Sequence, residues 1–424
     1  MGAGHSHAPR SLTRRQRSSR RRAVWAMLCI LVPLGLAAVL GMILLWPSGS
    51  QAGGGASGDA AFGGSDFLRG QVVAADLSDC QPQDPMPADG CARVEVQVGE
   101  RTGSLYLPPE AVAAGVEAGD AVRVIDLSED PDLFADDPQL AAEDPGAFGV
   151  TTDFVFVDYD RTVPLGLLAA LYALVVVAVA GWRGLRALIG LGLAFGIMLG
   201  FMLPALVAGH PPLLVALIAS TVIMYLVLYL AHGLTARTST ALLGTIAGIV
   251  ITTLLGAWMT DWSNLAGVYS EDAYVLDSLA SIDPRGLIMC GMVIAGLGVL
   301  NDVTITQASA VWELRESSPA LGPRGVFARA MRIGRDHIAS TVYTIAFAYA
   351  GAALATLLLI TVLDRSLIDA LTMGDIAVEV ARTLVGSIGL VLAIPMTTAI
   401  AVLISFATQA PEEAPGEAPA EATA

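Results

Sequence analysis

Several long apolar segments constrain the fold of this chain more than any other feature. Each reaches the roughly 20 residues that a helix needs to cross a lipid bilayer. The mean hydropathy of +0.65 and the hydrophobic fraction of 54% are both high for a soluble globular protein. The sequence therefore predicts an α-helical polytopic membrane protein whose principal partner is the lipid bilayer.

About eight segments are predicted to cross the membrane. They are residues 23–46, 163–182, 187–207, 213–231, 240–259, 287–309, 338–362 and 384–406. The first is longer than the core of a signal peptide, which favours an uncleaved signal anchor. Cleavage after the small residues near Ala52 is the alternative.

Charged residues are segregated along the chain in a way that predicts its orientation. The first 22 residues contain seven arginines and no acid, and arginines recur between alternate spans. The connections at 261–283 and 364–379 are acidic instead. Because basic loops stay in the cytoplasm, both termini are predicted there, with residues 47–160 outside a bacterial plasma membrane. The arginine-rich start then serves membrane orientation, and no nucleic-acid partner is expected.

The composition changes again between the first two spans. Segments such as ARVEVQV and AVRVIDL alternate polar and β-branched residues between turn signals. They predict a small extracytoplasmic OB-like or SH3-like β-barrel of five or six strands, in a structural or protein-contact role. The full predicted order is a basic disordered tail (1–22), signal anchor (23–46), flexible linker (47–65), β-barrel (66–128), acidic linker with a short strand (129–160), seven-helix bundle (161–408) and acidic disordered tail (409–424).

Several chemistries are excluded by residue content. The chain contains no lysine, so it lacks both a P-loop and a Schiff-base nucleophile. It also lacks HExxH, GxSxG and CxxC motifs, and we predict neither an enzyme nor a bound cofactor or metal. Cys80 and Cys91 flank a Pro/Asp-rich loop in the outer segment, where a disulfide is predicted; a metal site is the weaker interpretation.

The sixth predicted span carries an unusual number of polar groups for its position. Gly298 to Leu314 reads GVLNDVTITQASAVWEL and continues an apolar run. The candidate polar path consists of Asn301, Asp302, Thr306, Gln307, Ser309 and Glu313. Because charge in hydrocarbon is costly, such residues line a water-filled path or bond to neighbouring helices. The preceding glycines also suggest a helix break at Asn301–Asp302, as in transporter binding sites.

Partners for Asp302 are expected on other spans. The candidates are Thr252, Thr253, Thr341, Tyr343, Thr344, Tyr349 and Ser387. Arg382 begins the last span near the opposite membrane surface, so a direct pair with Asp302 is not expected. His337 falls at the predicted inner end of a span, which favours a simple polar anchor.

The sequence resembles the YibE/F-like family of bacterial multi-pass membrane proteins, in its actinobacterial form. The resemblance rests on the DYDR motif at residues 158–161, on GWRGLRAL at 181–188 and on the polar sixth span. It implies a plasma-membrane protein with an extracytoplasmic β-rich domain before a seven-helix bundle. It implies no active-site residues.

Two functions are compatible with these patterns. In the first, the protein is a permease-like transporter of a small solute or ion, and Asp302 is its proton- or cation-linked group. In the second, it is a non-transporting scaffold or accessory protein that binds an envelope protein through its outer β domain.

Overall fold

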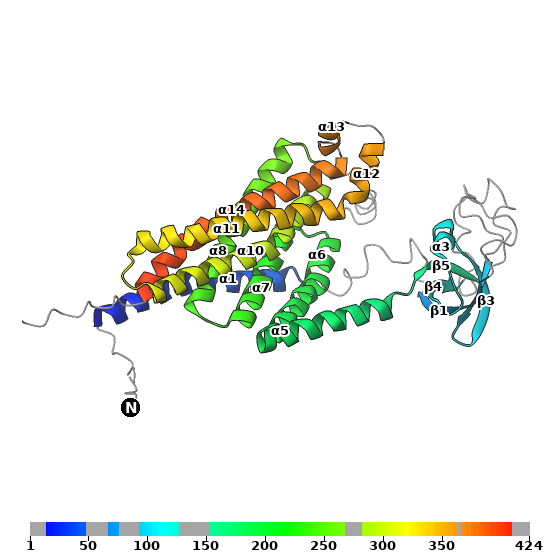
Figure 1. Ribbon diagram of the computed structural model, residues 1–424, viewed down its shortest axis with the longest axis horizontal. Coiled ribbons are helices and arrows are strands. Elements are labelled where there is room, and N and C mark those ends of the chain that lie inside the picture. Colours follow the sequence, from blue (N-terminus) through cyan, green and yellow to red (C-terminus); the bar gives the residue numbers. More distant parts are fainter. Residues whose placement is uncertain are drawn as a thin grey trace, which may run out of the picture. The chain divides into compact units, whose positions relative to one another are not determined.

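The computed structural model describes residues 14–47, 67–75, 93–126, 153–267, 282–362, 366–372 and 374–408, which form two compact units (Figure 1). The smaller unit, within residues 56–179, holds a β-sheet and the start of a long helix. The larger unit comprises the remaining residues and is a helical bundle. The predicted linker and the acidic C-terminal tail lie outside the described residues, as do Cys80 and Cys91.

The smaller unit contains five antiparallel strands. They are β1 (Leu68–Ala75), β2 (Arg93–Val98), β3 (Arg101–Tyr106), β4 (Ala121–Asp126) and β5 (Phe154–Tyr159), in the order β3-β2-β1-β4-β5. The short helix α3 (Pro109–Ala114) connects β3 to β4. Alternation in β2 buries Val94 and Val96 against the inner face, as the period-two pattern predicts. The strand predicted beyond the acidic linker is β5, and it belongs to this sheet because it pairs with β4.

The DYDR motif connects the sheet to the next helix. Asp160 accepts a hydrogen bond from the backbone N–H of Thr162 at 3.0 Å, which caps the start of helix α5 (Thr162–Ile197). Its carboxylate also lies 3.2 Å from Nε of Arg69 on β1 and 3.7 Å from Nη2 of Arg123 on β4. One side chain therefore ties two strands to the helix start, and it is only 8% exposed.

We expect Asp160→Asn to loosen this junction in a pH-dependent manner. Hydrogen bonds from Thr162 hold the pKa of Asp160 below its ordinary value of 3.8, and the hydrogen bond from Arg161 lowers the pKa of Asp158 in the same way. A lowered pKa stabilises the fold above the unfolded-state pKa, and this stabilisation is lost as pH falls through the folded-state value. Hydrogen exchange of β1 and β4 should be faster in the variant at pH 7, and the difference should shrink as pH falls below 3.8.

Glu100→Gln, on the turn between β2 and β3, removes a carboxylate away from the junction and is the control for this experiment. It should leave the exchange of β1 and β4 unchanged. A difference between Asp160→Asn and the unaltered chain that stays constant with pH would contradict the assignment.

The larger unit consists of long helices. They are α1 (Arg14–Leu44), the end of α5 with a π-helical turn η1 (Met198–Met202) and α6 (Leu203–Val207), then α7 (Pro212–His232), α8 (Ala236–Trp262), α10 (Pro284–Ser317), α11 (Pro323–Ala352), α12 (Leu354–Val362), α13 (Leu367–Leu371) and α14 (Gly374–Thr408). Among the described residues, six helices are long and apolar enough to cross a membrane, or seven if the bent pair α11 and α12 is one span. An integral membrane protein is thus supported, although fewer separate helices were found than the eight spans predicted.

The lower number has a local cause. Residues 162–207 count as one helical stretch where the sequence predicts two spans, and Gly181 between them has non-helical angles of φ 58° and ψ −139°. Glycine tolerates this positive φ because it has no Cβ. The chain is therefore interrupted at the position where the two predicted spans meet.

Three predicted boundaries differ from the structure. Helix α1 begins at Arg14, within the segment predicted to be a disordered tail. Helix α11 begins at Pro323, well before the span predicted at 338–362, and the 63° bend to α12 comes only after Ala352, within that predicted span. Helix α10 is also unbroken at Asn301 and Asp302, so the predicted helix break is wrong. Hydrophobicity marks where a helix enters the membrane, and it does not mark where the backbone stops being helical.

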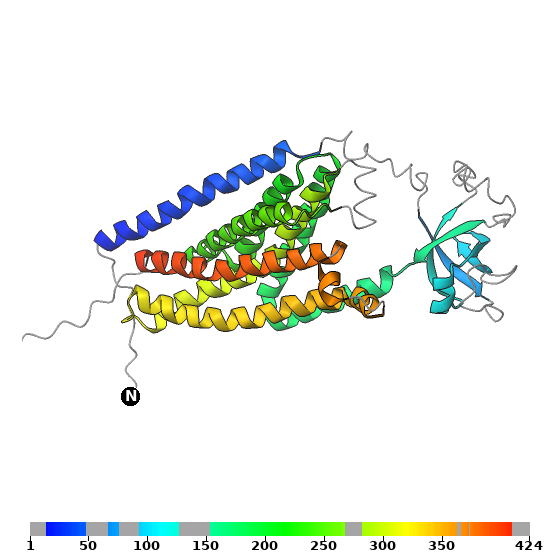
Figure 2. The ribbon, with the colours of Figure 1, turned by 90° about the horizontal axis from the view of Figure 1, so that it is seen from above.

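Helices α8, α10 and α14 form the centre of the bundle, with α7, α11 and α1 around them (Figures 1 and 2). Small residues permit this close packing, because a Cβ on Gly248 of α8 would lie 2.6 Å from Cδ2 of Leu300 on α10. Gly192, Gly196 and Gly200 also recur at four-residue spacing, but among the described residues nothing lies within 4 Å of a Cβ added to any of them.

Candidate functional site on helix α10

The structure divides the predicted polar residues of α10 between two faces. Asp302, Thr306 and Glu313 are exposed, and Ser309 is half-buried. They recur at helical spacing, and we call these four residues the Asp302 face. Gln307 is 3% exposed and points into the bundle. Asn301 is half-buried, and its Oδ1 is buried without a hydrogen-bond partner among the described residues. The six predicted residues therefore do not form one continuous path.

The Asp302 carboxylate has an ionisable neighbour on the adjacent helix. Nε2 of His337 on α11 lies 3.8 Å from Oδ2 of Asp302, which is too long for a hydrogen bond but within reach of a charge interaction. The side chain of Asp302 is 71% exposed and that of His337 is 28% exposed. An acid and an imidazole thus lie together between α10 and α11, and either group alone is uncommon within a membrane-spanning segment.

His337 was not among the partners predicted for Asp302. The sequence places it at the end of a span because the apolar run begins at Ile338. In the structure, α11 continues through this position, so His337 lies well inside the helix and faces α10. The sequence does contain one signal for this pair. If α10 and α11 are both continuous helices, Asp302 and His337 lie at similar distances along their helices from the turn that joins them.

Hydroxyl groups on the Asp302 face donate to their own helix. Thr306 Oγ1 donates to the backbone oxygen of Asp302 at 2.7 Å, and Ser309 Oγ donates to that of Ile305 at 2.7 Å. Such bonds satisfy the hydroxyl protons without breaking the helix. The oxygen lone pairs remain available, so the Asp302 face presents hydrogen-bond acceptors and two carboxylates.

Gln307 connects three helices instead of lining the Asp302 face. Its Nε2 donates to the backbone oxygen of Ala330 on α11 at 2.9 Å and to Oγ1 of Thr398 on α14 at 2.7 Å. Gly334 permits this contact, because a Cβ there would lie 3.0 Å from Oε1 of Gln307. The amide is thus occupied by interhelical bonds, which makes Gln307 a packing residue and removes it from the predicted path.

Buried threonine hydroxyls form a row along the contacts between α8, α10 and α14, and no spacing in the sequence marks them as a unit. Thr304 Oγ1 is 2.7 Å from Oγ1 of Thr245 on α8. Thr252 of α8 and Thr397 of α14 are also buried, and each faces a glycine of the other helix. Their Oγ1 atoms have no hydrogen-bond partner among the described residues. At these two positions threonine therefore stabilises the contact between α8 and α14 by packing against a glycine, and not by a hydrogen bond.

Arg382 takes a different partner, on its own helix. Nη1 of Arg382 pairs with Oε1 of Glu379, and Nη2 would be 3.2 Å from a Cβ on Gly291. This cluster lies on α14 and near the start of α10, away from Asp302 along the helix. Within the described residues, no group of three His, Cys, Asp or Glu side chains is arranged to hold a metal ion.

Comparison with known proteins identifies a family. A family model described as YibE/F-like protein matches residues 168–406, which is more than half of the chain and includes all of α10 and α11. No curated protein and no solved structure matches the chain.

Proposed function

Because this chain belongs to the YibE/F-like family and has membrane-spanning helices, we propose that it is a permease-like transporter whose path follows the Asp302 face of α10. The observation that carries the proposal is the exposed carboxylate of Asp302 beside His337 on a helix long enough to cross the bilayer. A carboxylate exposed to hydrocarbon costs about 3 kcal/mol or more, whereas a water-filled path removes most of that cost.

The chemistry of the Asp302 face favours a particular class of solute. It offers the carboxylates of Asp302 and Glu313 together with hydroxyl oxygens whose protons are already donated. Acceptors and negative charge complement a cation or a solute rich in hydrogen-bond donors. The transported species is therefore a small cation or a cationic solute. His337, whose Nε2 lies 3.8 Å from Oδ2 of Asp302, is placed to meet the same solute.

The proposal includes an orientation for the bundle. The N-terminal end of α1, the C-terminal end of α14 and the turn from α10 to α11 lie at one end of the bundle (Figure 2). Arginines are concentrated in these segments, including Arg21, Arg315 and Arg324. The positive-inside rule then favours cytoplasmic termini, with α1 as a signal anchor and residues 47–160 outside the cell.

The sheet is best explained as an OB-like barrel. The strand order β3-β2-β1-β4-β5, with a helix between β3 and β4, supports this assignment. The two edges approach each other, because the N–H of Asp153 donates to the oxygen of Ser104 at 3.1 Å and the N–H of Ser104 donates to Oδ2 of Asp153 at 2.9 Å. These bonds join β3 to the residue before β5 and partly close the sheet.

Thiol accessibility tests the path directly. Cys29 and Cys290 are first replaced by serine, and single cysteines are placed at Asp302, Thr306 and Glu313. Intact cells and inverted vesicles are then treated with a membrane-impermeant maleimide. We expect labelling at positions 302 and 306, because both side chains are exposed on one face of α10.

A cysteine at Gln307 is the matched control, since it differs from position 306 by one residue but lies on the buried face. It should stay unlabelled. If positions 302 and 306 are also unlabelled from both sides of the membrane, the Asp302 face is dry and the transport proposal fails.

A further inference from the structure

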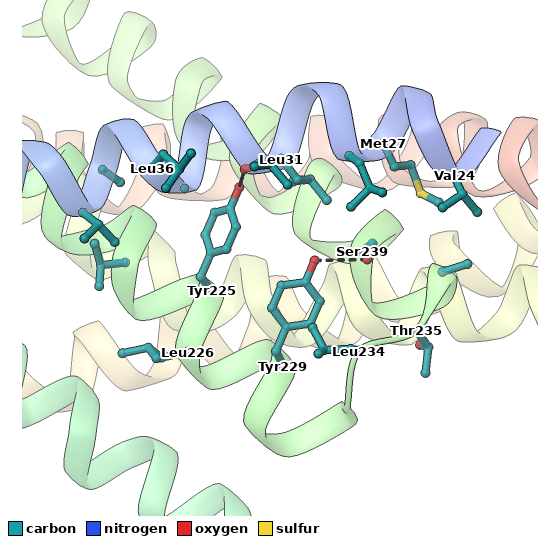
Figure 3. Close-up of a pocket in the computed structure, with 17 residues that line it drawn as sticks. Val24, Met27, Leu31, Leu36, Tyr225, Leu226, Tyr229, Leu234, Thr235 and Ser239 are labelled. Atoms are coloured by element: carbon teal, nitrogen blue, oxygen red, sulfur yellow. Dashed lines mark hydrogen bonds between the residues drawn. The ribbon is translucent and has the colours of Figure 1, made fainter. Parts of the chain in front are cut away.

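A groove of about 650 Å³ lies between α1, α7 and α8 (Figure 3). This volume is within the roughly 300–1,000 Å³ of typical small-molecule sites. Aliphatic side chains form most of its wall, including Met27, Leu31 and Leu36 of α1 and Leu226 of α7. The groove is separate from the Asp302 face, because none of the residues that line the groove belongs to α10 or α11.

The hydroxyl groups of the groove already have partners. Tyr225 donates from its hydroxyl to the backbone oxygen of Leu31 at 2.6 Å, and the hydroxyl of Tyr229 lies 3.0 Å from Oγ of Ser239 (Figure 3). Thr235 accepts from the backbone N–H of Thr238. A polar solute would find few unoccupied partners here, so the groove suits an aliphatic ligand.

The groove is also long enough to hold a lipid chain. The lining runs along α1 from Val24 to Val39, about 22 Å of helix at about 1.5 Å per residue. One leaflet contributes about half of the roughly 30 Å hydrocarbon core. Farther along α1, helices α1 and α7 pack closely, because a Cβ on Gly41 of α1 would lie 2.8 Å from Cδ1 of Ile218 on α7. The groove therefore narrows toward Gly41 and extends toward Val24.

The end near Val24 is cationic. Arg21 and Arg22 precede Val24 on α1, and Arg237 follows the lining residue Ala236 on α8; all three side chains are exposed. The sequence contains no aspartate or glutamate in α1, in α7 or in α8 before Asp261. The helices that form the groove thus supply cations at this end without a carboxylate to neutralise them.

We propose that this groove binds an anionic phospholipid, with one acyl chain between α1, α7 and α8 and the phosphate near Arg21, Arg22 and Arg237. Arginine recognises phosphate through charge-assisted hydrogen bonds, and basic clusters at the cytoplasmic surface attract anionic lipids. The proposal does not depend on transport, since it concerns a different set of helices and residues.

Native mass spectrometry of the full-length protein in detergent tests this site. Phosphatidylglycerol and phosphatidylcholine with identical chains are added at equal concentrations, and the bound fraction of each is measured. The unaltered protein should retain at least about tenfold more phosphatidylglycerol, because three arginines act on one headgroup. Arg21→Gln/Arg22→Gln/Arg237→Gln should abolish this preference, and Leu28→Trp/Leu36→Trp should reduce binding of both lipids by filling the groove.

Matched controls distinguish the groove from general membrane affinity. Arg324→Gln/Arg329→Gln/Arg332→Gln removes the same number of exposed arginines from α11 and should keep the preference. Leu40→Trp/Ile43→Trp changes exposed residues of α1 that do not line the groove and should keep binding. Equal retention of the two lipids by the unaltered protein would overturn the proposal, as would an equal loss in either control.

Discussion

Replacing Gly244 with alanine is expected to destabilise the helical bundle strongly. An added Cβ would overlap Oγ1 of Thr397 and lie 2.9 Å from its Cβ, so rotation of the threonine cannot relieve the contact. Helices α8 and α14 must then move apart at the centre of the bundle. We expect a loss of about 3 kcal/mol, the upper part of the usual range for overpacking. The shift in thermal unfolding in detergent measures it.

Two comparisons make this prediction specific. Gly192→Ala adds the same methyl group inside a helix where nothing lies within 4 Å, so its stability should be at least that of the unaltered chain. Gly389→Ala should destabilise through overlap with Oγ1 of Thr252, and adding Thr252→Ala should restore stability because the remaining Cβ is 3.3 Å away. Equal unfolding temperatures for Gly244→Ala and Gly192→Ala would refute the assigned contact.

Asp302→Asn is expected to abolish transport while leaving folding intact. The substitution keeps the size of the side chain and removes its charge, and the side chain is 71% exposed, so little packing is lost. Without the carboxylate, a cationic solute loses the counter-charge that Asp302 provides. Complementation of a strain that lacks the protein measures activity, and the amount of protein in the membrane measures folding.

Three further variants separate the possible outcomes. Asp302→Glu should keep part of the activity because it keeps the charge, and His337→Gln should reduce activity with less effect on the amount of protein. Deletion of residues 67–127 removes most of the sheet and should abolish activity if the protein is a scaffold that binds through its outer domain. Full activity of Asp302→Asn combined with loss in the deletion would favour that second function.

The main elements of the fold follow from the sequence. The predicted spans at 213–231 and 240–259 correspond to α7 (Pro212–His232) and α8 (Ala236–Trp262), which extend slightly beyond them. The strands were predicted from alternation, and the five-stranded antiparallel sheet agrees with it. The boundaries were less accurate, as in α11, because a helix continues into water when its residues are good helix formers.

The candidate site was predicted only in part. The polar content of α10 is explicit in the sequence, and Asp302 lies on this long helix as the sequence predicts. The sequence does not point to His337 as the neighbour of Asp302, and it does not show that Gln307 bonds to Ala330 and Thr398. Both features depend on the rotation of α10 and α11 about their axes.

There is a physical reason why the sequence predicts the helices and strands better than the contacts between helices. The cost of moving a helix into lipid is nearly a sum over its own residues, so composition alone determines which segments span the membrane. Lipid tails are as apolar as a protein interior, so hydrophobicity does not show which face of a spanning helix meets its neighbours. That choice depends on the fit of small and polar residues, such as Gly244 against Thr397, between helices distant in sequence. The pairing of Asp302 with His337 and the separation of Gln307 from them were therefore decided only by the tertiary structure.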